Sequence, residues 1–523
     1  MKKSIIFGLL FLPFCFSCKK VIDTAPFNTF SSASAFSTSA RVDLSLNGVY
    51  DAAQSGLYTD GSRRGYPFGA ANLEMGDMRG EDMVNVATFY QIVYQATYNS
   101  VSPNVIAMWK GLYALINEAN VCIVGFQGAA DAHIITSATA TQYTAECRFL
   151  RAMAHHEALI HFARPYTDGG GKGAGVPWRD SAINSSTSVN AIYTKPRMRT
   201  DSVYAKILAD LDFAEANLPV TNQVYRATKA AAIALKMRVK MHMGDWAGVI
   251  TEGNKIISGT APAFSSPIGG WALNASPDGA FLLGAYSTKE SIFSIKNDAL
   301  DNPGVNAAIS TMYAASDHKG RGLIVVSPII WNDPRWLCDD KRRKLLTYQG
   351  GDGNGSPGIF VYKYRDSTGL GDFTPQIRYA EVLLTMAEAQ ARSGAGVSSG
   401  AVDLLNAVRS RSLGLPTEAY TTASFAAQSD LVKAILFERR VEFLGEGKRW
   451  ADISRLSPDP NYSPGGIPAK ALNASVKPLS TYNCGAGYTP GQGAIPYSDY
   501  RFIWPIPLTE IQQNPIIAQN PNY

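Results

Sequence analysis

The sequence carries little charge for its length. Of its 523 residues only 17% are Asp, Glu, Lys or Arg, against about 25% in a typical soluble protein. Lys and Arg number 48 and Asp and Glu 43, so the formal net charge is +5. This excess is too small to indicate a nucleic-acid partner. An aromatic content of 11% excludes a disordered chain, and we predict a folded protein with a large core.

Residues that could build a metal or redox centre are also scarce. Beyond the first twenty residues no Cys-x-x-Cys pair occurs, and four cysteines remain: Cys122, Cys147, Cys338 and Cys484. Their spacing is compatible with disulfides and with buried thiols. His156 and His161 are five residues apart, so on a helix they point about 140° apart and cannot bind one ion. We expect no metal and no cofactor, with these histidines at helix surfaces or interfaces.

Long hydrophobic runs are missing except at the N-terminus. Lys2 and Lys3 precede an apolar run at 5–16 that is too short to span a membrane. This pattern is typical of a secretory signal peptide. Ser17 before Cys18 predicts a lipoprotein with a signal peptide at 1–17, an acylated Cys18 and a tether at 18–40. An ordinary secreted protein cut nearby and a buried N-terminal segment are the alternatives.

Helical periodicity covers much of the remaining chain. Apolar residues at spacings of three and four predict helices at 42–53, 104–124, 141–163, 201–218, 227–243, 245–257, 378–392, 401–411 and 429–443. Gly244 and Gly394 mark turns between paired helices. The helix starts at Asp201 and Asp245 are 44 residues apart, which does not match the tetratricopeptide period of about 34. We predict a mainly helical protein with a degenerate helical-repeat body.

Two stretches, 259–375 and 456–523, are irregular. Gly, Pro, Asn and Ser separate short apolar runs there, and those at 291–295 and 359–364 predict β-strands. Long irregular segments in a compact protein are often functional. We therefore expect a loop-rich lobe with minor β structure.

A row of glutamates, Glu438, Glu442 and Glu446, raises the question of a catalytic site. A glycosidase needs two carboxyl groups facing each other across the sugar. Here basic residues are interleaved, so we expect structural ion pairs and no catalytic site. The expected pairs are Arg439 with Glu442, Glu446 with Arg449, and Lys448 with Asp452.

Several motifs along the chain fit one pattern. The segment ERRVEFLGEGKRWAD at 438–452 matches ERR-x-E-(x)3-EG-x-R-W-x-D, and RYAEVLLTMAEA occupies 378–389. The chain ends with WPIP at 504–507 and QNPNY at 519–523. WKGLY at 109–113, AECRFLRA at 145–152 and DPR at 333–335 complete the set. With the lipoprotein signal, these motifs resemble the SusD/RagB family of outer-membrane nutrient-binding lipoproteins.

The resemblance implies a fold and a role. It implies about four tetratricopeptide-like helix pairs in a scaffold at 41–260 and 376–455, with the lobe at 261–375 and 456–523. It also implies a lipid-anchored protein on the outer-membrane surface. Such a protein binds poly- or oligosaccharide and delivers it, without catalysis, to a SusC-like TonB-dependent transporter. A peptide-binding RagB-like receptor and a scaffold that mainly binds its protein partner are the alternatives.

The ligand site is expected in two irregular segments, a first at 79–99 and a second at 271–336, where aromatic rings and polar groups can bind a sugar. The small net charge favours a neutral ligand over electrostatic capture. Tyr90, Tyr94 and Tyr98 could instead form one buried helical stripe, and Trp331 and Trp336 could pack structurally. The candidate residues are Arg79, Asp82, Tyr90, Tyr94, Tyr98, Asn99, Trp271, Tyr313, Trp331 and Trp336.

Overall fold

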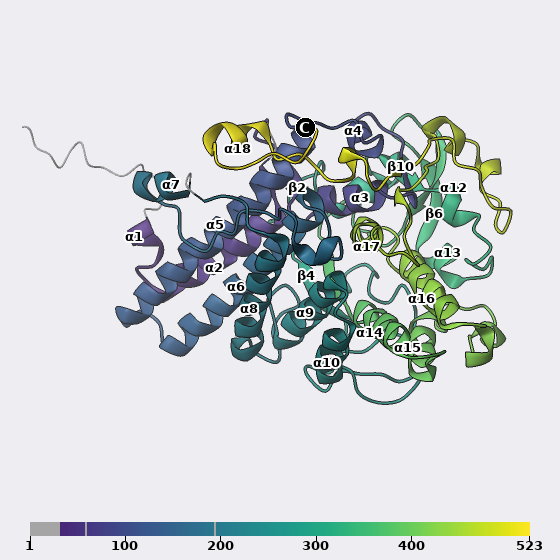
Figure 1. The fold of residues 1–523 in the computed structure, drawn as a ribbon, viewed down its shortest axis with the longest axis horizontal. Helices are drawn as coiled ribbons and strands as arrows, with labels where there is room; N and C mark the ends of the chain where they lie inside the picture. The colour runs from purple at the N-terminus through teal and green to yellow at the C-terminus, as the bar shows by residue number, and fades with distance from the viewer. Residues whose placement is uncertain (1–31, 58–59, 193–194) are drawn as a thin grey trace, which may run out of the picture.

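The computed structural model describes residues 32–57, 60–192 and 195–523 (Figure 1). The predicted signal peptide, Cys18 and residues 18–31 of the predicted tether lie outside the described residues. Residues 32–40 include the short helix α1 (Ser32–Ala35) and the start of the first long helix.

A row of long helices forms the body of the protein. In Figure 1 it runs from the purple and blue helices to the green ones, and each helix packs against a neighbour in the row. The predicted helices are confirmed, although several ends shift by a few residues. The mainly helical prediction with a tetratricopeptide-like body is thus confirmed. The helices are α2 (Ser39–Gln54), α5 (Pro103–Asp131), α6 (Ser137–Phe162), α8 (Thr200–Asn217), α9 (Lys229–Met243), α10 (Trp246–Ile256), α14 (Tyr379–Ser393), α15 (Ser399–Arg409) and α16 (Gln428–Glu442).

Local sequence explains where these helices begin and end. The Thr228 hydroxyl accepts a hydrogen bond from the Ala231 amide and caps the start of α9. Gly244 ends α9 in the left-handed conformation, with φ at 71°. Asp245 then caps α10 by accepting from the amide of Gly248. This sharp turn lets α9 and α10 pack side by side.

The rest of the chain is made of short elements. The remaining helices are α3 (Ala70–Met78), α4 (Gln91–Tyr94), α7 (Ser186–Ile192), α11 (Ile309–Tyr313), α12 (Pro328–Trp331), α13 (Lys341–Leu345), α17 (Arg449–Leu456) and α18 (Leu508–Gln513). The strands are β1 (Gly56–Leu57), β2 (Arg63–Tyr66), β3 (Met83–Asn85), β4 (Ser291–Ile295), β5 (Ile324–Val326), β6 (Thr347–Gly351), β7 (Pro357–Val361), β8 (Thr374–Arg378), β9 (Gly466–Ile467) and β10 (Ile495–Pro496). The strands pair antiparallel, β1 with β2, β3 with β5, β4 with β8, β6 with β7 and β9 with β10.

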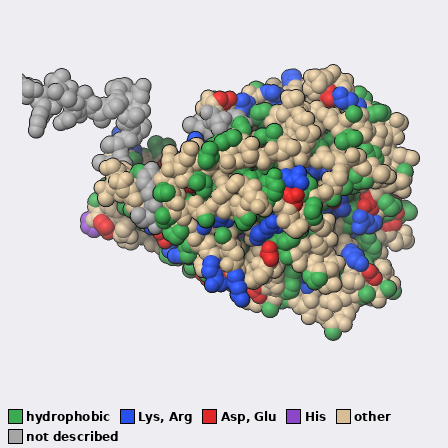
Figure 2. All heavy atoms as spheres, turned by 45° about the horizontal axis from the view of Figure 1, so that its top comes forward, with side chains coloured by type: hydrophobic (Ala, Val, Ile, Leu, Met, Phe, Trp, Pro, Cys, Tyr) green, Lys and Arg blue, Asp and Glu red, His purple; other side chains and the backbone are tan. Residues whose placement is uncertain are grey.

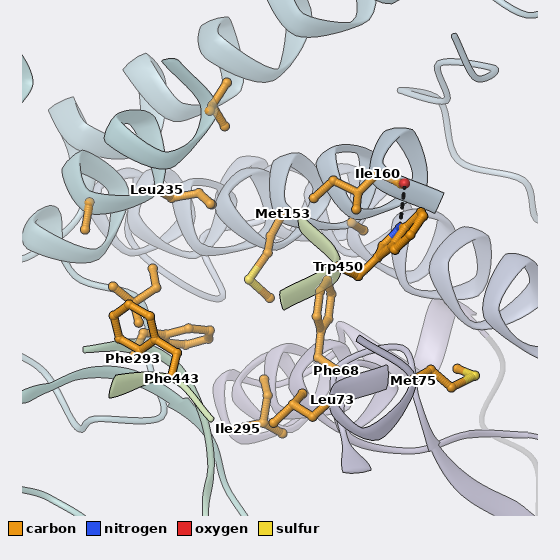
Figure 3. Packing of buried hydrophobic residues seen from close by; sticks show 14 of the residues in the cluster. Phe68, Leu73, Met75, Met153, Ile160, Leu235, Phe293, Ile295, Phe443 and Trp450 are labelled. Carbon is orange, nitrogen blue, oxygen red and sulfur yellow. Dashed lines mark hydrogen bonds between the residues drawn. The ribbon is translucent and has the colours of Figure 1, made fainter. Parts of the chain in front are cut away.

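One hydrophobic core joins the helical body to the loop-rich lobe (Figure 3). Met153 and Ile160 of α6 face Phe68 and Trp450, which come from the segments around α3 and α17. The Trp450 indole donates a hydrogen bond to the Ile160 carbonyl at 3.3 Å. Burial of a large aromatic side chain contributes a few kcal/mol, roughly 2–3, so these contacts hold the segments around α3 and α17 against α6.

The row of glutamates lies in a buried ion-pair network. Arg378, at the end of β8, contacts Glu290, Glu442 and Glu446, and all four side chains are at most 2% exposed. The Arg378–Glu442 and Arg378–Glu446 distances are 3.0 and 2.7 Å. Arg411 adds a second contact to Glu442 at 2.7 Å. The expected structural role of these carboxylates agrees with this geometry.

The ion-pair partners, however, differ from those predicted. Arg439 pairs with Asp452 at 3.0 Å, and Arg449 pairs with Glu81 at 2.6 Å. Lys448 contacts Glu381 at 3.4 Å. The predicted pairs were wrong because the carboxylates have other partners: Glu442 contacts Arg342, Arg378 and Arg411, and Asp452 contacts Arg439 and Arg455. Between the end of α16 at Glu442 and the start of α17 at Arg449 the chain turns, so Glu446 reaches Lys363 and Arg378 instead of Arg449.

Of the two positions predicted for the histidines, surface and interface, the surface position is wrong. His155, His156 and His161 of α6 are at most 2% exposed. Burial lowers the pKa values of His155 and His156 to about 3, so both are neutral at pH 7. Within the described residues, no group of three or more His, Cys, Asp and Glu side chains is placed to hold a metal ion.

Two of the four cysteines form a disulfide and the other two are buried thiols. Cys338 and Cys484 form a disulfide across 146 residues of sequence. It joins the two irregular stretches of the chain to each other. Cys122 and Cys147 are buried free thiols in the helical body.

Candidate functional site

Two of the sequence-predicted site residues, Arg79 and Asp82, are held in the core. The Arg79 guanidinium lies 3.5 Å from the ring centroid of Trp450 and 4.7 Å from that of Trp504. Asp82 is 2% exposed and pairs with Arg440. Their polar groups are therefore engaged inside the protein.

The three tyrosines are buried, but they do not form one helical stripe, because α4 is a single turn that ends at Tyr94. Tyr90 hydrogen-bonds to the buried Glu74. The hydroxyls of Tyr94 and Tyr98 donate to main-chain carbonyls of the C-terminal segment. Asn99 is exposed, and its side-chain oxygen accepts from a nearby amide.

The aromatic residues of the second predicted segment are spread over different places. Tyr313 is 1% exposed and donates to Asp77 at 2.8 Å. Trp336 is 2% exposed and packs edge to face on the partly exposed Trp331, with centroids 5.5 Å apart. Trp271 is partly exposed on a separate loop. The structure does not bring these rings together into an open platform.

A groove of about 760 Å³ has three walls, and we call it the loop groove. The first wall is formed by residues 85–95, the second by 316–323 with the hairpin turn at 353–354, and the third by 472–492. Of the ten predicted residues, Tyr94 lines the loop groove. The lining residues are Asn85, Val86, Ala87, Thr88, Gln91, Tyr94, Gln95, Ser316, Gly320, Arg321, Leu323, Gly353, Asn354, Leu472, Asn473, Lys477 and Gln492.

Backbone pairing assembles the groove from distant parts of the sequence. Asn85 of β3 pairs with Ile324 of β5, which places residues 85–95 beside 316–323. The turn of the β6–β7 hairpin is held to residues 316–323 by a hydrogen bond from the Gly353 amide to the Gly322 carbonyl. The third wall, residues 472–492, is anchored where Lys470 and Gln492 exchange backbone hydrogen bonds of 3.0 and 2.9 Å.

A buried lysine supports the floor of the groove. Lys470 is 1% exposed and donates to the carbonyls of Met78 and Tyr94 at 2.8 and 2.7 Å. Its ammonium also lies 4.6 Å from the Tyr94 ring centroid. Burial lowers the pKa of Lys470 to about 7. These contacts tie the first wall to the third.

Side-chain amides dominate the groove, at Asn85, Gln91, Gln95, Asn354, Asn473 and Gln492. Among the described residues, no hydrogen-bond partner is present for the buried Oδ1 atoms of Asn85 and Asn473. Gln91 and Gln95 are exposed. An amide both donates and accepts, so a set of them can bind a ligand with many hydroxyl groups. Exposed Leu472 adds an apolar contact.

Sequence reasoning missed these amides because it searched for aromatic rings. Gln91 and Gln95 stand four residues apart beside the predicted tyrosines, and that spacing was the available signal. Asn354 and Gln492 carried no such signal, since only strand pairing brings them to the groove.

A second groove of about 410 Å³, beside α16 and α17, suits a ligand less well. The Arg335 guanidinium covers the Phe437 ring at 4.2 Å, and Arg392 covers Tyr462 at 4.3 Å. Arg440 in its wall is paired with Glu81 at 3.0 Å. Its aromatic faces and its arginines are therefore already engaged.

Two family models match this chain, one in its N-terminal part and one in its C-terminal part. Residues 347–523 match the model of the SusD family, and residues 28–241 match a family described as starch-binding associating with outer membrane. The chain belongs to the SusD/RagB family. Among the residues that the structure describes, no helix is both long and apolar enough to cross a bilayer.

Individual proteins similar to this chain agree with this assignment. SusD-like protein P2 of Formosa agariphila is 27% identical over 87% of this chain and 91% of its own length. A SusD superfamily protein from Bacteroides fragilis superposes with a TM-score of 0.72 at 25% identity, covering 92% of this chain and 99% of that one. Surface glycan-binding protein A from Bacteroides uniformis shares the fold, with a TM-score of 0.67 at 21% identity and coverage of 92% and 99%.

Proposed function

We propose that this SusD/RagB protein binds poly- or oligosaccharide in the loop groove and takes part in its uptake without catalysis. The observation that carries the proposal is the groove itself, a space of about 760 Å³ lined by six side-chain amides, of which Asn85 and Asn473 have a buried oxygen without a partner among the described residues. Pockets for small ligands commonly measure about 300–1,000 Å³, so a few sugar units fit.

The family relationship supports a surface role. One matching family is described as associating with outer membrane, and a structural relative is named as a surface glycan-binding protein. We propose that Cys18 carries the lipid anchor on the cell surface and that a SusC-like TonB-dependent transporter receives the glycan. The anchor needs no spanning helix, because the lipid supplies the membrane affinity.

Titration calorimetry of the mature protein against a panel of oligosaccharides tests the binding step. The double variant Gln91→Ala/Gln95→Ala should weaken binding about tenfold, since each lost hydrogen bond contributes about 0.5–1.5 kcal/mol. The matched control is Gln512→Ala/Gln513→Ala on α18, where two exposed glutamines lie outside the groove lining.

The outcomes separate the proposal from its alternatives. Glycan binding that weakens in the groove variant but not in the control supports it. Binding to peptides with no response to any glycan would overturn it in favour of a peptide receptor. Glycan binding that is unchanged in the groove variant would move the site away from the loop groove.

A further inference from the structure

The loop groove carries charge of one sign only. Arg321 and Lys477 are its charged lining residues, and no Asp or Glu lines it. The face of the molecule in Figure 2 is different, because acidic and basic side chains are interspersed there. A purely basic lining is therefore a local feature that the net charge of +5 does not show.

Neither of these two cations forms a salt bridge with a described residue. The salt bridges among the described residues, with nitrogen and oxygen within 4.0 Å, include neither Arg321 nor Lys477. Asp317 and Asp352 are near Arg321 in the fold but outside the groove lining; their Oδ1 atoms accept from backbone amides of the β6–β7 hairpin, and neither forms a salt bridge with Arg321. Glu74 is also outside the lining and is fully buried, and this burial raises its pKa well above the ordinary range.

The two cations come from different walls of the groove. Arg321 follows the 3₁₀ turn Ser316–His318, and Lys477 follows the 3₁₀ turn Asn473–Val476. A chain of sugars lying in the groove would therefore meet a positive group on each side. Arg321 can bind a planar carboxylate or a sulfate through two parallel hydrogen bonds, and Lys477 acts as a point charge.

We propose that the loop groove selects acidic glycans, meaning oligosaccharides that carry carboxylate or sulfate groups. This inference rests on the proposed function, because it names the ligand class of the same site. The amides bind the hydroxyl groups of the sugar units, while Arg321 and Lys477 bind the acidic substituents. A neutral glycan would satisfy the amides and leave both cations without a counter-charge.

The experiment compares ligands and variants together by titration calorimetry. The probes are an oligogalacturonate of about six units for carboxylate, a sulfated carrageenan oligosaccharide for sulfate, and maltoheptaose as the neutral ligand. The variant is Arg321→Gln/Lys477→Gln. The control, Lys110→Gln/Lys172→Gln, removes the same charge from exposed lysines outside the groove lining.

We expect at least one acidic probe to bind more tightly than maltoheptaose, and this binding to fall about tenfold in the groove variant. The control should bind as the parent protein does. Because exposed charges are screened by salt, the difference should also shrink as salt rises from about 0.01 M to 1 M.

Two results would overturn the inference in different ways. If maltoheptaose binds and the acidic probes do not, or if acidic binding is unchanged in Arg321→Gln/Lys477→Gln, the acidic class is wrong and the glycan function stands. If neither acidic nor neutral glycans bind, the proposed function fails and the inference fails with it. Comparison of the carboxylate and sulfate probes identifies the preferred acidic group.

Discussion

Removal of one buried arginine tests whether the ion-pair network holds the lobe on the helical body. Arg378 is 2% exposed and contacts Glu290, Glu442 and Glu446. The change Arg378→Met keeps an unbranched side chain of similar length and removes the positive charge. Three buried carboxylates then lose a partner in a region that water cannot reach, and such a loss is strongly destabilising.

The size of the effect follows from the structure. Burial alone would raise the pKa of Glu442, but Arg411, Arg378 and Arg342 outweigh it and lower the value from 4.5 to about 2. A carboxyl with a lowered pKa stabilises the fold above pH 4.5, and that stabilisation is lost as the pH falls towards 2. The lowering of the Glu442 pKa from 4.5 to about 2 corresponds to about 3 kcal/mol in the free energy of unfolding. Because Arg342 and Arg411 remain, we expect Arg378→Met to cost about 3 kcal/mol, the lower end for broken buried pairs.

Urea denaturation at pH 7, followed by circular dichroism, measures this cost from the midpoint and slope. The control is Arg199→Met, which breaks an ion pair with Asp201 where the arginine side chain is 58% exposed. We expect the control to cost less than about 1 kcal/mol. Glu442→Gln provides a second break in the network. Losses below about 1 kcal/mol in both network variants would refute the reasoning.

Three further predictions concern stability. Trp336→Ala should lower the free energy of unfolding by about 3–5 kcal/mol in urea denaturation, because Trp336 is 2% exposed. A loss typical of a surface residue would contradict the burial of Trp336. Reduction of the Cys338–Cys484 disulfide, which closes a loop of more than 100 residues, should cost about 4–5 kcal/mol, seen as a lower melting temperature that the double serine variant reproduces without reductant. His155 and His156 have pKa values lowered from 6.5 to about 3, so the unfolded chain takes up protons first as the pH falls below 6.5. Each should remove about 1.4 kcal/mol of stability per pH unit in that window, and a denaturation midpoint that stays flat from pH 6.5 to 5 would disprove this.

The helical body could be predicted because its signals are local. Apolar spacing identified α8, and Gly244 marked the turn into α10, since each depends on neighbouring residues alone. The ion-pair partners of Arg439 and Arg449 could not be predicted. Their carboxylates come from other elements, and the choice between a helical neighbour and a distant one depends on which other cations reach the neighbour, as Arg342, Arg378 and Arg411 reach Glu442.

The loop groove, too, could be predicted from the sequence only in part. The first segment was identified as a site because its composition is unusual, yet Tyr90 and Tyr98 are buried away from the groove, and Tyr94 lines it together with the glutamines. Burial of an aromatic ring is decided by tertiary packing, which composition does not report. Gln492 and Asn354 reach the groove only through the pairing of residues hundreds of positions from β3.

The three walls of the loop groove have a consequence for how its specificity can change. The walls are joined by backbone pairs, so a substitution of a groove-facing side chain changes one wall and leaves these pairs and the other two walls in place. Loops tolerate such changes better than the core. A receptor built this way can acquire a new ligand one wall at a time, while its helices and the buried charges beneath them stay the same.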